Sequence, residues 1–397
     1  MPPARTLFLN LGHLLDHLFM LIFAKAAFEA GRDFGFGSEV AYAEMIPYGM
    51  PAAVLFGAGA PLAAHLADRW SRETMLAVFF FGIGVSSLAA SFTTTPFGLG
   101  LALAAIGLFA SIYHPVGIAM LVEGDGAVGS RLGVNGVWGN LGVAGAPLLA
   151  GLALVHFDWR MAFAAPGLGA LAVGVAYLTR LGRRAPDTSG ALAATPPSED
   201  RMAEGWQRSL LAIGLVTLAG GFVFGAITFM IPRLFEVRLT DLTIDAALTG
   251  TLAAMVFAIA SFSQIFVGRQ LDRRSAKTIL FLVGAGQPPL LVWMAFGSDV
   301  ALLTAALLAM LFIFGQVPIS DVSLSRCVPD RLRPKILSFK FLLNLSVGAM
   351  TLPLVAWMLK NGGGFESMLE LLALASICVT LAALVLPTQS ARLRGSE

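Results

Sequence analysis

The apolar residues of this chain gather in long runs that few charged residues interrupt. Each run is about 20 residues long, enough for a helix to cross a hydrocarbon core of about 30 Å. Only helices and closed barrels bond every backbone polar group in lipid, and the alternation of barrel strands is absent here. We therefore predict an all-α polytopic membrane protein with twelve transmembrane helices. The predicted spans are 6–28, 44–66, 74–93, 97–122, 131–154, 160–179, 208–232, 246–267, 277–297, 300–322, 335–359 and 366–387.

The composition agrees with a protein that has the lipid bilayer as its surroundings. Hydrophobic residues make up 57% of the chain and charged residues 13%, and the mean hydropathy is +0.80. A soluble domain carries about 25% charged residues. The formal net charge of +2 gives no reason to expect a nucleic-acid partner. Cys327 and Cys378 imply no disulfide framework, and the first apolar run lacks the cleavage site of a secretory signal.

The longest polar break runs from Arg180 to Arg208 and divides the apolar runs into two sets of six. Its proline and charged residues are typical of a flexible linker. We expect an N-terminal six-helix bundle at residues 1–180, a cytoplasmic linker at 181–207 and a C-terminal six-helix bundle at 208–397.

The Lys and Arg residues indicate the orientation. Of the 26 in the chain, 19 fall in segments on the same side as both termini. Loops rich in these residues stay in the cytoplasm. Both termini are therefore predicted to be cytoplasmic, in a bacterial inner (plasma) membrane.

The two halves repeat each other. Three landmarks recur at nearly one offset: Asp68 and Asp272 are 204 residues apart, Asn140 and Asn344 are 204 apart, and Pro115 and Pro318 are 203 apart. An even number of helices in each half gives a parallel repeat, related by an axis along the membrane normal.

Three titratable residues, His13, Asp16 and His17, share one face of the first span because positions i, i+3 and i+4 coincide on a helix. Such groups are costly in lipid and often mark ion or substrate pathways. We predict a proton-coupling site here in a central cavity, together with Tyr113 and His114, since histidine changes its charge near neutral pH. The alternative is a structural cluster that holds the helices together by hydrogen bonds.

The segment Ala64 to Glu73 resembles the signature loop of the major facilitator superfamily, G-x-L-a-D-R-x-G-R-[K/R], and Gly268 to Lys277 resembles its second copy. The resemblance covers essentially the whole chain. It implies a cytoplasmic latch in which a carboxylate bonds Arg and a helix N-terminus of a neighbour. The alternative is ordinary anchoring by positive charges. The gate residues are Asp68, Arg69, Arg72, Asp272 and Arg273.

Within that superfamily the chain is most similar to the fosmidomycin-resistance-like drug exporters. Three patches carry this resemblance: the His13…Asp16 pattern, Ser111 to Pro115, and Asn140 to Ala150. The fifth span also resembles the antiporter motif of the superfamily, at Gly133, Gly142, Ala146-Pro147 and Ala150-Gly151. Val116 stands where that family has an acidic residue. The resemblance implies export rather than import.

In the second half, the equivalents of the first-span cluster are Thr217, Gly220 and Gly221. Titratable groups are thus concentrated in the first half, and we expect the second half to supply aromatic and amide contacts to the substrate. The predicted substrate-cavity residues are Asn140, Phe224, Gln287, Gln316 and Asn344. An ion pair is predicted between Asp321 and Lys340, at similar depth on consecutive helices.

These observations favour a monomeric, proton-coupled exporter of a small amphipathic molecule that works by alternating access. No nucleotide-binding, catalytic or metal-binding pattern is present, so we expect no enzyme, no cofactor and no metal site. One alternative is an importer of a metabolite or organic anion with the same fold. The other is a membrane sensor or scaffold that does not transport.

Overall fold

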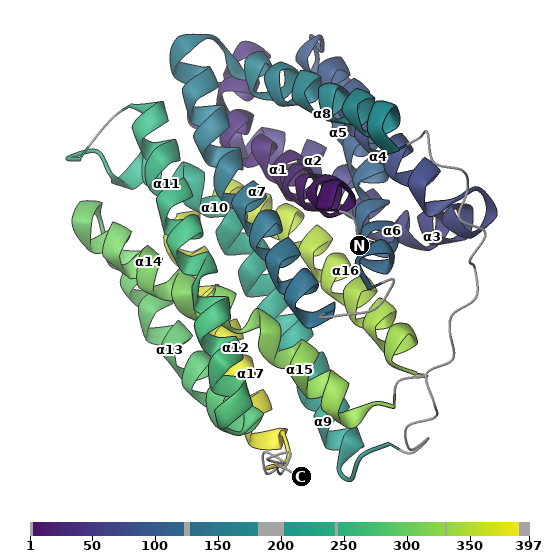
Figure 1. Cartoon of the computed structure of the whole chain (residues 1–397). Coiled ribbons are helices and arrows are strands. Elements are labelled where there is room, and N and C mark those ends of the chain that lie inside the picture. Colours follow the sequence, from purple (N-terminus) through teal and green to yellow (C-terminus); the bar gives the residue numbers. More distant parts are fainter. Residues whose placement is uncertain (1–2, 123–127, 182–201, 243–244, 330–331, 389–397) are drawn as a thin grey trace.

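The structure is a computed structural model that describes residues 3–122, 128–181, 202–242, 245–329 and 332–388. Every regular element in these ranges is a helix (Figure 1). The first half of the chain forms α1 (Pro3–Asp33), α2 (Ala41–Ala58), α3 (Ala60–Arg69), α4 (Arg72–Ser91), α5 (Pro96–Ala110), α6 (Tyr113–Val122), α7 (Val128–His156) and α8 (Trp159–Leu181). The second half forms α9 (Trp206–Leu215), the π-helix η1 (Val216–Gly220), α10 (Gly221–Arg238), α11 (Ala246–Ser261), α12 (Ser263–Arg273), α13 (Ala276–Phe296), α14 (Asp299–Gly315), α15 (Val317–Cys327), α16 (Arg333–Lys360) and α17 (Gly364–Val385).

The predicted apolar runs all fall on helices. Within the described residues, ten helical segments are long and apolar enough to cross a membrane, or eleven if α2 and α3 form one span bent by 44°. The remaining run, 335–359, lies on α16, which contains the shorter apolar piece Ser346–Lys360. The prediction of an all-α polytopic membrane protein is confirmed, and most of the linker at 181–207 lies outside the described residues.

Several spans consist of two helices in succession. The fourth predicted span is broken between α5 and α6, the seventh contains the π-helix η1, and the tenth is broken between α14 and α15. Pro115 and Pro318 lie in the first turns of α6 and α15. A proline is tolerated there because the first N–H groups of a helix have no partner within the helix. Both breaks redirect the side chains that follow them.

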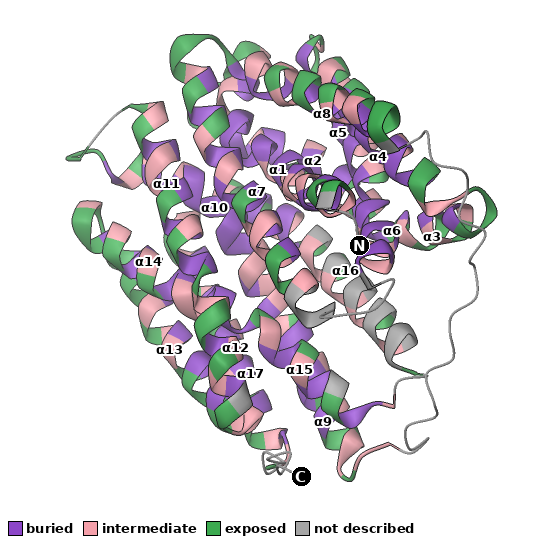
Figure 2. Cartoon of the chain, viewed as in Figure 1, coloured by how far each residue is buried: buried purple, intermediate pink, exposed green. Residues whose placement is uncertain are grey.

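The outer helix faces carry many large apolar side chains, whereas buried residues lie toward the interior (Figure 2). Phe266, Trp357 and Leu374 are examples of exposed apolar residues. In a soluble protein such surfaces would favour association, but in a bilayer they face lipid. The burial pattern therefore agrees with the membrane class.

The two halves of the chain touch mainly toward one end of the helix bundle. We call the other end of the bundle the termini end: there Phe8 near the start of α1 packs on Tyr177 near the end of α8, and Arg208 near the start of α9 donates to the Val385 carbonyl at the end of α17. The opposite ends of those helices form the far end. The two halves meet where α7 packs on α11, α2 on α16 and α1 on α10. Among the described residues, the bonds and ring contacts between the halves lie toward the far end: Lys25 with Glu236 and Thr249, Glu44 with Lys360, Tyr42 with Phe229 and Phe365, and Phe28 and Tyr42 with Arg233.

Candidate functional site

The titratable residues of α1 face the start of α6. Because the chain breaks between α5 and α6, Tyr113 and His114 are the first two residues of α6 and lie beside the His13 side of α1. The ring of His13 also lies over α7 at Gly139, where a Cβ would come within 2.6 Å of His13 Nε2. A residue with a side chain at 139 would therefore displace this imidazole.

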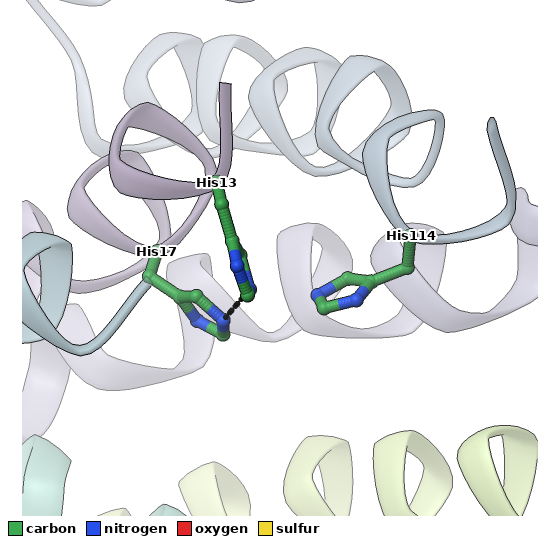
Figure 3. A group of neighbouring side chains, drawn as sticks. All are labelled: His13, His17 and His114. Atoms are coloured by element: carbon green, nitrogen blue, oxygen red, sulfur yellow. Dashed lines mark hydrogen bonds between the residues drawn. The ribbon is translucent and has the colours of Figure 1, made fainter. Parts of the chain in front are cut away.

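The three imidazoles of His13, His17 and His114 lie together between these helices (Figure 3). The ring centroid of His114 is 5.4 Å from that of His13 and 5.5 Å from that of His17. His13 Nδ1 lies 2.8 Å from the carbonyl oxygen of Asn135, and His13 Nε2 lies 3.1 Å from His17 Nε2. Since a carbonyl can only accept, His13 Nδ1 carries a proton, and the Nε2 of a neutral His13 then accepts from His17.

Asp16 is fully buried beside this group. It contacts His114, whose Nε2 lies 3.3 Å from Asp16 Oδ2. Neither oxygen of Asp16 has a well-formed hydrogen bond to a described residue. A buried carboxylate with so few partners is costly when charged, so its charge state should depend strongly on His114 or on a bound ligand.

Tyr113 belongs to a hydrogen-bond network beside the histidines, of which only Tyr113 was predicted as a site residue. Its hydroxyl donates to the Leu9 carbonyl at 2.7 Å, and the Asn135 amide donates to the Tyr113 oxygen at 2.8 Å and to Asn10 Oδ1 at 3.0 Å. This network joins α1, α6 and α7. Tyr113 therefore positions the helices that carry the histidines.

Asn10 and Asn135 were missed as site residues. Both are buried amides inside apolar spans, a signal that the sequence does contain, because an amide in a membrane helix needs a bonding partner. On α7, the helix of Asn135, the residue predicted for the substrate cavity was Asn140. Asn140 is half-buried.

The predicted substrate residues of the second half lie around η1. Gln287 Nε2 donates to Gln316 Oε1 at 2.8 Å, and Gln287 Oε1 is buried without a hydrogen-bond partner among the described residues. A Cβ at Gly220 would collide with Gln316, and one at Gly221 would collide with Asn344. Phe224, one turn further along, stacks on Phe314 with ring centroids 5.3 Å apart.

Two hollows are present in the described part of the second half. One is lined by Val216 of η1 together with Ala212, Leu280 and Ser320, and the other by Arg238 and Gly297 at the far end. No predicted substrate residue lines either hollow. Gln287, Gln316 and Asn344 are therefore grouped by their contacts near η1 and not by a shared hollow.

The predicted gate residues lie at the termini end. Asp68, Arg69 and Arg273 are exposed, and Arg72 is half-buried. The side chain of Asp272 lies outside the described residues. Arg326 is a further basic residue at this end. Its guanidinium donates to the carbonyl of Leu271 at 2.9 Å, and Leu271 directly precedes Asp272. The latch between the halves stays a prediction.

Lys340 and Asp321 form an ion pair between α16 and α15. The side chain of Asp321 is 48% exposed and that of Lys340 is 16% exposed. The pair is therefore less buried than its place in two apolar spans suggested, and it should contribute less than a buried pair.

The sequence as a whole matches one protein family. The profile of the Major Facilitator Superfamily matches residues 18–338. The chain belongs to this superfamily. It is a family of transporters and not of enzymes, and its members are multi-pass membrane proteins.

Curated relatives of this superfamily member include drug-resistance proteins. It is 29% identical to the chloramphenicol resistance protein of Streptomyces lividans over 311 residues, which cover 75% of each chain. It is 33% identical to the puromycin resistance protein pur8 of Streptomyces alboniger over 108 residues, 26% of this chain and only 22% of that protein.

Solved structures support the same fold. A bacterial homologue of the human lysosomal transporter Spinster, in an inward-facing and unoccupied conformation, matches with a TM-score of 0.75 at 13% identity over 97% of this chain and 98% of that one. A D-xylose–proton symporter matches with a TM-score of 0.74 at 15% identity over 96% and 95%. At such identities the likeness concerns the fold alone.

Proposed function

We propose that this superfamily member is a proton-coupled secondary transporter that exports a small amphipathic molecule. The observation that carries the coupling is the fully buried carboxylate of Asp16, 3.3 Å from the imidazole of His114. Intramembrane carboxylates paired with histidine serve as proton relays in transporters. Export is supported by the resistance proteins among the relatives and by the glycine and proline spacing of α7.

Alternating access would move the two halves, at residues 1–180 and 208–397, against each other. The contacts between the halves lie toward the far end, around Lys25 and Glu236. With both termini in the cytoplasm of a bacterial cell, the far end would face outward, and these contacts would close the protein on the outer side. The far-end contacts must break before a substrate can leave on the other side, and the Asp68 latch would then close the termini end.

The two halves would divide the chemistry. Protonation of Asp16 removes a buried negative charge. When the proton leaves, the negative charge returns and His114 must balance it. The second half offers neutral amides, Gln287 and Gln316, and the ring of Phe224. Amides and an aromatic ring suit an uncharged or amphipathic substrate that carries a few hydrogen-bonding groups.

A whole-cell assay tests direction and coupling. Bacterial cells that express the chain are compared with vector cells for accumulation of chloramphenicol, puromycin and a panel of small amphipathic compounds. We expect lower accumulation of at least one compound, abolished by a protonophore. Higher accumulation would make the protein an importer. Unchanged accumulation of every compound would favour the alternative of a membrane sensor or scaffold that does not transport.

A further inference from the structure

We propose that His13, His17 and His114 form a binding site for a divalent late transition-metal ion, of the Zn²⁺, Ni²⁺ or Co²⁺ class. The sequence shows no metal-binding pattern, and no metal site was expected from it. The structure brings one ligand nitrogen from each of the three within 4.8 Å of the others. Figure 3 shows the three rings directed toward one another.

The spacing suits a shared ion. Zinc holds imidazole nitrogens at about 2.0–2.1 Å in a tetrahedral arrangement, which places two ligand nitrogens about 3.3 Å apart. His13 Nε2 and His17 Nε2 are 3.1 Å apart. They come from positions i and i+4 of α1, so one helix supplies two ligands on one face. His114 of α6 offers the third nitrogen, which lies within 4.8 Å of the other two and must come closer when an ion binds.

His13 already has the support that a ligating histidine needs. A metal-bound histidine usually donates its other ring N–H to a carbonyl or carboxylate, which fixes its tautomer and orientation. His13 Nδ1 lies 2.8 Å from the Asn135 carbonyl, itself on a buried residue. The Nε2 lone pair is thereby directed at the other two rings.

Asp16 gives a second and independent reason to expect a cation. This carboxylate is fully buried, its oxygens lack a well-formed hydrogen bond, and Oδ2 lies 3.3 Å from His114 Nε2. A cation held by the imidazoles would balance its charge. Three imidazole nitrogens make a donor set that suits zinc and its neighbours, whereas Mg²⁺ and Ca²⁺ prefer oxygen ligands.

This inference rests on the geometry of the cluster and not on the proposed function. A proton and a metal ion compete for the same nitrogens, so a bound ion would keep the imidazoles unprotonated. Metal binding can therefore be measured on the purified protein without any transport. A failure of one idea leaves the other standing.

The test is a titration of the full chain, purified in detergent, freed of its affinity tag and stripped with a chelator. Isothermal titration with Zn²⁺ should show one site, and Co²⁺ should give the visible absorption of a tetrahedral nitrogen and oxygen site. Mg²⁺ should not bind. Binding of Mg²⁺ equal to that of Zn²⁺, or no site for Zn²⁺, would overturn the proposal.

The chain offers matched controls, because His65 and His156 are the other two of its five histidines, and both are exposed. His17→Gln and His114→Gln should each weaken Zn²⁺ binding at least about tenfold, while His65→Gln and His156→Gln leave it unchanged. His17→Cys keeps a ligand and should retain binding, which separates lost ligation from lost folding. Wild-type affinity in both His17→Gln and His114→Gln would contradict the site.

Discussion

Equivalent positions of the two halves carry different chemistry. In the first half, Asp16 and His17 place a carboxylate and an imidazole between α1 and α6. In the second half, those positions are Gly220 and Gly221, and the space beside them is taken by the side chains of Gln316 and Asn344. A glycine is needed there because a Cβ would collide with these amides. One half of the repeat therefore keeps titratable groups, and the other keeps neutral hydrogen-bonding groups.

The helix breaks show how this difference arises. Tyr113 and Gln316 lie at equivalent breaks, each two residues before a proline. Tyr113 bonds the backbone of α1 and its network holds α7, whereas Gln316 bonds Gln287 of α13. Gln287 Oε1 is buried without a hydrogen-bond partner among the residues that the structure describes, which costs about 1–3 kcal/mol unless a ligand or water bonds it. The same break thus positions a tyrosine beside the titratable cluster in one half and a glutamine beside a buried amide oxygen in the other.

The largest effect on stability should come from the charges that join the halves. Glu236→Ala removes the carboxylate that pairs with Lys25, whose side chain is fully buried, and with Arg233. Removing one partner of a buried pair typically costs about 3–5 kcal/mol, measured as a lower free energy of unfolding. The matched control is Glu44→Ala, since the Glu44–Lys360 pair is about one third exposed and should contribute about 0–1 kcal/mol. Equal losses would show that burial does not distinguish the pairs.

A smaller loss of stability is expected from alanine at Gly142, and a still smaller one from alanine at its equivalent in the second half, Ser346, 204 residues further on. A Cβ at Gly142 would collide with the Leu14 backbone of α1, so Gly142→Ala must move α7 away from α1. Overpacking of this kind costs about 1–3 kcal/mol. Ser346 is exposed, and Ser346→Ala should cost less than about 0.5 kcal/mol. A Gly142→Ala protein as stable as the wild type would mean that α1 and α7 need not be so close.

The smallest effect is expected from the Asp321–Lys340 pair. Because Asp321 is about half exposed, a double-mutant cycle of Asp321→Ala and Lys340→Ala should give a coupling of about 0–1 kcal/mol. A coupling of about 3 kcal/mol or more would show that the pair is effectively buried. Asp321 would then resemble Asp16 more closely, and the contrast between the halves would weaken.

The sequence predicted the helical spans well because hydropathy alone reports burial in lipid. It also predicted that His13, Asp16 and His17 share a face, since that follows from helical periodicity. It did not predict that Asn135 would hold His13, or that Gln287 would bond Gln316, because contacts between helices depend on how the helices pack. The sequence did place His114 in the same predicted site, but the distances between its ring and those of His13 and His17 depend on the break between α5 and α6.

The central claim is that the first half carries the proton, and its most direct test uses Asp16→Asn in proteoliposomes. The matched control is Asp241→Asn at an exposed carboxylate. With a compound that the wild type moves, internal pH and compound content are followed under an imposed pH gradient. The account predicts that Asp16→Asn loses substrate-dependent proton movement and uphill transport, yet still exchanges the compound down its gradient, while Asp241→Asn behaves as wild type. Uphill transport by Asp16→Asn at the wild-type rate would contradict it.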